Sequence, residues 1–159
     1  MKHFYYFVIA LFLLIAFNNS FAQERRFGLG VMFGEPTGIS AKLWTSQDNA
    51  LDFGLGWSTF DNGHNYSGSR VHFHMDYLWH SFNLIKSSDR FPIYYGVGGR
   101  FDGGAGNEGS LAVRGVLGIA WMPRSTPIDI FLELAPSFEL TPASGFAMDA
   151  AIGIRYFFE

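Results

Sequence analysis

Charged side chains and histidines recur at every second position within short apolar segments of the sequence. The charged residues are Lys42, Asp52, Asp76, Arg100, Arg114, Asp129, Glu133, Asp149 and Arg155, and the histidines are His72, His74 and His80. Acids and bases occur together in this set, so the first chemistry it offers is mutual pairing in salt bridges. Because an isolated buried charge costs several kcal/mol, we expect these residues to pair with one another wherever they are enclosed.

The histidines also raise the question of a metal site. His72 and His74 share one face of a strand, close enough to chelate an ion in principle, and Asp76 continues their row. A metal site would need a fourth ligand and supporting groups around the first ligands, and the sequence shows neither. We therefore interpret the histidines as hydrogen-bonding groups and expect no metal and no cofactor.

A hydrolase acting on lipids would need a serine, a histidine and an acid brought together at the membrane surface. His80 and Ser81 are neighbours, but adjacent residues on a strand point to opposite faces. No Gly-x-Ser-x-Gly motif occurs either. We expect no enzyme activity, and a lipid-modifying enzyme is kept as an alternative hypothesis.

Eight segments in which apolar residues alternate with polar or small ones carry these side chains. We predict strands at residues 27–33, 39–44, 51–57, 71–80, 93–101, 111–121, 128–134 and 146–158, with a glycine-rich loop at 102–109. The seventh strand could continue to Leu140, but Pro136 has no N–H to donate, which predicts a loss of regular pairing near residues 135–137. Glycines on the charged face would make room for the long arginine side chains; they include Gly28, Gly30, Gly54, Gly56, Gly96 and Gly98.

The opposite face of these segments carries no charged residue. In the fourth, sixth and eighth segments it ends in aromatic residues, namely Trp79, Trp121, Tyr156 and Phe158. If neighbouring strands alternate in direction, these ends meet at one rim, as in the aromatic girdle of a membrane barrel. We predict an all-β fold, an eight-stranded antiparallel up-and-down transmembrane β-barrel, over a secreted sandwich or a lipocalin-like barrel.

The interior of an eight-stranded barrel is just wide enough for side chains to fill it. The charged face would then form a salt-bridged plug, and the protein would have a structural or interaction role with a closed lumen. The same residues leave a second hypothesis open, a narrow channel for ions or small polar solutes.

The first residues differ from the rest of the chain. A positive charge at Lys2 precedes an apolar run at residues 4–17, and small residues follow at Ser20 and Ala22. That run is shorter than the roughly 20 residues of a spanning helix, so we expect a signal peptide at residues 1–22 and a barrel domain at 23–159. A net charge of -3 argues against a nucleic-acid partner.

Three segments carry a family resemblance: Gly-Val-Gly-Gly-Arg at residues 96–100, Phe-Leu-Glu-Leu-Ala-Pro at 131–136 and the aromatic end Ile-Arg-Tyr-Phe-Phe at 154–158. With the eight alternating segments, the chain resembles small bacterial outer-membrane barrels of the OmpA, OmpX and OmpW type, especially a family of small barrels that carries the first two segments. The resemblance implies a place in the bacterial outer membrane, contact with its lipid, and recognition of the terminal strand by the barrel assembly machinery during biogenesis. We expect a monomer.

Overall fold

The computed structural model describes residues 25–58, 70–104, 107–142 and 144–159. The segment predicted as a signal peptide, residues 1–22, lies outside the described residues. Within them, no helix has the length and apolar character needed to cross a membrane. The strands are β1 (Phe27–Gly34), β2 (Thr37–Trp44), β3 (Asn49–Ser58), β4 (Arg70–Ser81), β5 (Ile93–Gly104), β6 (Asn107–Trp121), β7 (Ile128–Thr141) and β8 (Gly145–Phe158).

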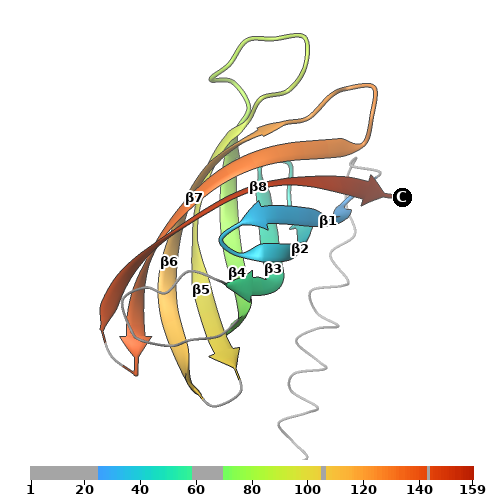
Figure 1. Ribbon diagram of the computed structural model, residues 1–159. Helices are drawn as coiled ribbons and strands as arrows, with labels where there is room; N and C mark the ends of the chain where they lie inside the picture. Colours follow the sequence, from blue (N-terminus) through green and yellow to red (C-terminus); the bar gives the residue numbers. More distant parts are fainter. Residues whose placement is uncertain (1–24, 59–69, 105–106, 143) are drawn as a thin grey trace, which may run out of the picture.

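The eight strands form a closed barrel in which each strand pairs antiparallel with its neighbours in sequence (Figure 1). β1 closes the barrel because Phe27 lies opposite Leu43 of β2 and opposite Phe158 of β8. Closure removes the unpaired sheet edges that an open sheet would present. The prediction of an all-β, eight-stranded antiparallel barrel is confirmed.

The observed strand limits differ from the predicted ones between β5 and β6. β5 continues to Gly104 and β6 begins at Asn107, so six of the eight residues of the predicted glycine-rich loop lie in strands. Asp102 lies opposite Ser110, and the register shifts between Asp102 and Gly104. Glycine and aspartate are poor strand formers in isolation, but neighbouring strands hold them in the ladder here.

Pro136 interrupts pairing on one side of β7 only. On the β8 side, Pro136 lies opposite Met148 in an unbroken ladder, so the predicted loss of pairing is wrong there. On the β6 side, the ladder has no pairs for Gly115 and Val116, which face Pro136 and Ala135 when the flanking register is continued. A residue without an N–H can disturb one neighbouring ladder while the other stays intact.

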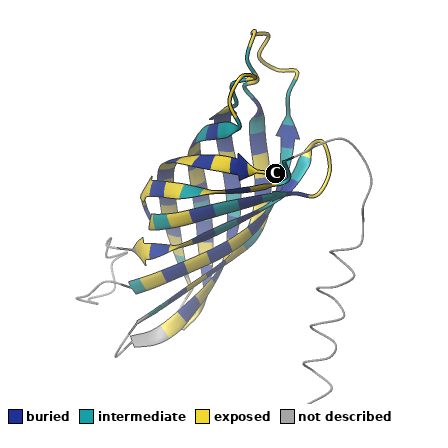
Figure 2. Cartoon of the chain, turned by 90° about the vertical axis from the view of Figure 1, so that its right-hand side faces the viewer, coloured by how far each residue is buried: buried dark blue, intermediate teal, exposed yellow. Residues whose placement is uncertain are grey.

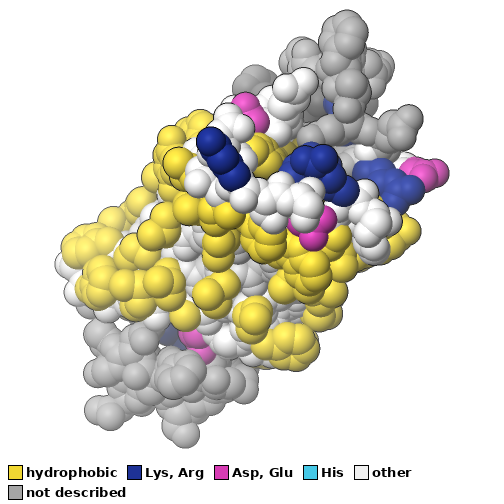
Figure 3. Space-filling view, turned by 90° about the horizontal axis from the view of Figure 1, so that it is seen from above, with side chains coloured by type: hydrophobic (Ala, Val, Ile, Leu, Met, Phe, Trp, Pro, Cys, Tyr) yellow, Lys and Arg dark blue, Asp and Glu magenta, His cyan; other side chains and the backbone are white. Residues whose placement is uncertain are grey.

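Buried and exposed residues alternate along the strands (Figure 2). The outward positions carry large apolar side chains, among them Val97 and Leu117, which are more than half exposed at 56% and 55%. Among strand residues whose burial is described, no charged side chain is exposed. This distribution is the reverse of that in a soluble protein, where the enclosed face is apolar. Figure 3 shows hydrophobic side chains over much of the surface in view, with the charged side chains gathered in one part of it.

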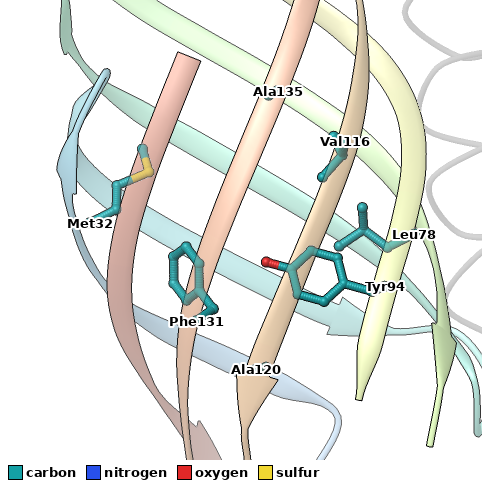
Figure 4. Close-up of a cluster of buried hydrophobic side chains, with 7 residues drawn as sticks. All are labelled: Met32, Leu78, Tyr94, Val116, Ala120, Phe131 and Ala135. Carbon is teal, nitrogen blue, oxygen red and sulfur yellow. The ribbon is translucent and has the colours of Figure 1, made fainter. Parts of the chain in front are cut away.

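The inward face also carries apolar residues that the sequence interpretation did not single out. One buried cluster consists of Met32, Leu78, Tyr94, Val116, Ala120, Phe131 and Ala135 (Figure 4). A second consists of Trp44, Ala50 and Phe157, with Phe82 and Met122 packed against it. The interior is therefore filled by apolar clusters as well as by charged groups.

Candidate functional site

The buried charged side chains come from β2 to β8 and converge inside the barrel. We call this set the lumen network; its members are Lys42, Asp52, Asp76, Arg100, Asp102, Arg114, Asp129, Glu133, Glu139, Asp149 and Arg155. All of them occupy inward positions of the strands, because side chains two residues apart share a face. The ion pairs divide the network into two groups.

Arg100 and Arg114 organise the first group. Arg100 Nε lies 2.8 Å from Asp102 Oδ2, its Nη2 donates to Glu139 Oε1 at 2.8 Å, and its Nη1 donates to Asp149 Oδ2 at 3.0 Å. One guanidinium thus binds three carboxylates from three strands. Five N–H donors in a fixed plane allow an arginine to do this, whereas a lysine cannot present donors in that geometry.

Arg114 joins the same group through other atoms. Its Nε lies 3.1 Å from Asp76 Oδ2, its Nη2 donates to Glu133 Oε1 at 2.8 Å, and its Nη1 lies 3.8 Å from Asp149 Oδ2. The hydroxyl of Tyr94 donates to the second oxygen of Glu133 at 3.1 Å. These contacts connect β4, β5, β6, β7 and β8 across the lumen.

Arg155 and Lys42 organise the second group. Arg155 Nη2 lies 2.6 Å from Asp52 Oδ1, and its Nε donates to Ser40 Oγ at 2.8 Å. Asp129 Oδ2 lies 3.4 Å from both Arg155 Nη1 and Lys42 Nζ. The guanidinium carbon of Arg155 also lies 3.9 Å from the ring centre of Phe131, a distance suited to a cation–π contact.

The histidines have different partners. His72 Nδ1 lies 2.9 Å from Asp102 Oδ1, and His72 Nε2 lies 3.0 Å from His74 Nδ1. His80 approaches Lys42 Nζ through Nε2 at 3.3 Å and the carbonyl of Asp48 through Nδ1 at 3.2 Å. These contacts agree with hydrogen-bonding histidines, and they place His72 and His74 in one chain that ends on a carboxylate.

The structure places all nine charged residues singled out from the sequence in the lumen network. It adds Asp102 and Glu139, which the sequence interpretation missed, and the uncharged partners Ser40 and Tyr94. Strand parity could have found both acids, since Asp102 is two residues from Arg100 and Glu139 continues the inward series of β7. Asp102 was missed because the fifth predicted strand ends at residue 101. Glu139 was missed because regular pairing of the seventh strand is predicted to stop near Pro136.

The side chains packed against the inward glycines are not the predicted arginines. A Cβ built on Gly54 would lie 2.1 Å from His74 Cε1, and one on Gly98 would lie 2.0 Å from Asp76 Oδ1. At Gly118 the nearest atom is Cζ of the Tyr94 ring, at 2.2 Å. The prediction that glycines make room for arginine side chains is therefore wrong at Gly54 and Gly98, which accommodate a histidine and an acid, and Gly118 accommodates an aromatic ring.

The outward aromatics predicted at one rim do lie together at the end of the barrel that carries the C-terminus. Trp79 stacks with Tyr95 at a ring distance of 5.7 Å, and Tyr156 contacts Phe158 edge-on at 5.2 Å. The indole N–H of Trp121 donates to Asp89 at 3.1 Å, beside the polar connections of this rim. A second set of exposed aromatics lies toward the opposite rim and consists of Phe33, Trp57, Phe101, Phe138 and Phe146.

A pocket of about 740 Å³ opens at the rim that carries the C-terminus. Trp44, Phe82 and Phe157 belong to its lining, and the buried Trp44 and Phe157 are members of the second apolar cluster. Next to the network itself, a cavity of about 10 Å³ is lined by His74, Arg114, Glu133 and Asp149 among others. That volume admits about one water molecule.

Comparisons with known proteins found no matching family model, no matching curated protein and no matching solved structure.

Proposed function

We propose that the protein is a transmembrane β-barrel of a bacterial outer membrane, with a closed lumen and a structural or interaction role rather than a catalytic one. The observation that carries this proposal is the reversed distribution of side chains. The outer wall exposes large apolar residues, while the buried strand positions hold eleven charged side chains. Lipid stabilises such a wall because its acyl chains cover the apolar side chains, which would otherwise be exposed to water.

The spacing of the aromatic rims supports the same proposal. On β8, Phe146 and Tyr156 are both exposed and ten residues apart. At about 3.4 Å per residue and a tilt of 35–45°, they would be about 24–28 Å apart along the barrel axis. Membrane barrels have an apolar band of about 25 Å between two aromatic girdles. Trp79, Trp121, Tyr156 and Phe158 would form one girdle, and the aromatic set around Trp57 and Phe146 the other.

The way the interior is filled supports a closed lumen. The lumen network crosses the barrel, and the two apolar clusters lie in the same interior. An ion following this path would have to displace arginines that are each bound by two or more carboxylates. We therefore expect no steady conduction, in contrast to the hypothesis of a narrow channel.

Membrane fractionation and gel mobility test the location. We expect the protein in the outer-membrane fraction, with an unheated band that migrates differently from the boiled band because a folded barrel resists detergent unfolding. Recovery as a soluble periplasmic protein would overturn the proposal.

Planar bilayers test the closed lumen. We expect no unitary current steps from the wild-type barrel. Steady steps that are altered by Arg114→Ala or Glu133→Ala, and not by the exposed control Arg124→Ala, would favour the channel instead. A changed lipid A profile on overexpression would favour the lipid-modifying enzyme.

A further inference from the structure

We propose that the lumen binds a divalent first-row transition-metal ion through Asp52, His74 and Asp76. Ligand atoms of these three residues all lie within 4.8 Å of one another, and all three side chains are buried. Asp52 and Asp76 lie directly opposite each other on β3 and β4, and His74 is two residues from Asp76 on the same face. The barrel thus brings one imidazole and two carboxylates to one point.

The distances are too long for a direct hydrogen bond and leave space for a shared ion. His74 Nε2 lies 4.0 Å from Asp76 Oδ2, beyond hydrogen-bonding range. Two donor atoms bound to a tetrahedral Zn²⁺ at about 2.0–2.2 Å are about 3.3–3.6 Å apart, so a closing of about half an ångström would bring these two atoms to one ion. Like charges directly opposite on neighbouring strands are destabilising, and a cation between Asp52 and Asp76 would reverse the sign of that interaction.

A buried oxygen of these three residues lacks a hydrogen bond. Asp76 is 1% exposed, and its Oδ1 has no hydrogen-bond partner among the described residues. His74 is 2% exposed, and its Nε2 approaches the other oxygen of Asp76 to 4.0 Å. Because buried polar groups are nearly always satisfied, the free oxygen of Asp76 calls for a partner that the described side chains do not supply.

A chain of hydrogen bonds prepares His74 for this role. If both imidazoles are neutral, His72 donates its Nδ1–H to Asp102 and accepts at Nε2 from the Nδ1–H of His74. This arrangement leaves the lone pair of His74 on Nε2, the nitrogen nearest Asp76. Histidine ligands almost always donate their other N–H to a supporting group, so the structure contains the support that the sequence did not reveal.

Glycines make room for two of the ligands. Gly54 lies opposite His74 and Gly98 opposite Asp76 in the strand register. A Cβ at either glycine would come within 2.0–2.1 Å of the ligand side chain, so any other residue would displace it. The side chains of His74 and Asp76 therefore pack against the backbone of these glycines.

The charge balance of the lumen also favours a cation. Its network has seven carboxylates and four cationic side chains, an excess of three negative charges when all the carboxylates are ionised and the histidines are neutral. Arg114 holds Asp76 Oδ2 at 3.1 Å, and Arg155 holds Asp52 Oδ1 at 2.6 Å. An ion bound by both carboxylates would connect the two groups of the network. A site with an imidazole suits Zn²⁺ or a similar ion better than Mg²⁺ or Ca²⁺, which prefer oxygen alone.

Metal titration of the folded full-length barrel in detergent micelles, after chelator treatment, tests the site. We expect one equivalent of Zn²⁺ by elemental analysis, and visible absorption bands from Co²⁺ that Zn²⁺ abolishes. His74→Gln should weaken binding at least 100-fold, and His72→Gln should weaken it 10- to 100-fold because only the support is lost. The control His80→Gln changes a lumen histidine outside the site and should leave affinity unchanged. Absence of stoichiometric binding, or equal loss in His80→Gln, would overturn the proposal.

A second measurement covers the case in which His74→Gln does not fold, as judged by loss of the heat-modifiable band. Imidazole nitrogen resonances of the wild-type barrel report on His74 directly, once the other four histidines are assigned by comparison with His3→Gln, His64→Gln, His72→Gln and His80→Gln. Zn²⁺ should shift the His74 Nε2 resonance and leave both nitrogens of His80 in place. An unshifted His74 Nε2 at saturating Zn²⁺ would refute the site, whatever membrane the barrel occupies.

Discussion

Replacing Arg100 by methionine should lower the free energy of unfolding by about 4–5 kcal/mol. Methionine keeps much of the length of the side chain but removes the charge and all donors. Asp102, Glu139 and Asp149 each receive a contact of 2.8–3.0 Å from Arg100, and all three are buried. Removing one partner of a buried ion pair costs about 3–5 kcal/mol, and three carboxylates left beside one another place this site at the upper end of that range.

Equilibrium unfolding by urea in lipid vesicles, followed by tryptophan fluorescence, measures this loss, since all four tryptophans lie in the strands. The matched control is Arg124→Met, the same substitution at an exposed position, which should change stability by less than about 0.5 kcal/mol. Adding Asp149→Asn to Arg100→Met should recover part of the loss, because one uncompensated charge is removed. A loss below about 1 kcal/mol in Arg100→Met, or an equal loss in the control, would refute the account of the network as paired buried charge.

Two further substitutions test the wall and the packing of the barrel. Gly118→Ala should lower the free energy of unfolding by about 1–3 kcal/mol in the same urea assay, because the new Cβ would lie 2.2 Å from the Tyr94 ring. The control Gly99→Ala should be nearly neutral, because the nearest atom to its Cβ is 3.8 Å away. Equal effects of the two substitutions would contradict the close packing inside the barrel. Leu117→Arg, at an outward position in the interior of β6, should cost about 2–4 kcal/mol in a bilayer, whereas Phe146→Arg near a rim should cost about 0–1 kcal/mol. Similar small costs at both positions would speak against lipid around the wall.

Strand parity made the two faces predictable from the sequence. Lys42, Asp52 and Arg155 could be assigned to one face because side chains of a strand alternate without exception while the ladder is regular. The same parity predicts Asp102 and Glu139, and the error lay in the strand limits. Turn-forming residues predict the end of a strand, whereas pairing with the neighbouring strands continues through them in the structure.

The pairing of charges was beyond the reach of the sequence. Arg114 binds Asp76, which is 38 positions earlier, and Glu133, which is 19 positions later. These partners meet because the strands tilt and shift in register around the barrel, and neither quantity is encoded in a local pattern. The link from His74 through His72 to Asp102 was hidden for the same reason, since it depends on the register of β4 against β5.

The charged interior gives the barrel a defined register, and this property is the strongest argument for a structural role. A slip of one residue moves every side chain of a strand to the other face. On β8, such a slip would remove Arg155 from its salt bridge with Asp52 and leave that buried carboxylate unpaired, at a cost of about 3–5 kcal/mol. An interior as apolar as the wall would impose no such penalty, and alternative pairings would compete. The ion pairs therefore favour one strand register over the alternatives, even if each pair contributes little net stability. A metal ion shared by Asp52 of β3 and His74 and Asp76 of β4 would select the register of those two strands in the same way.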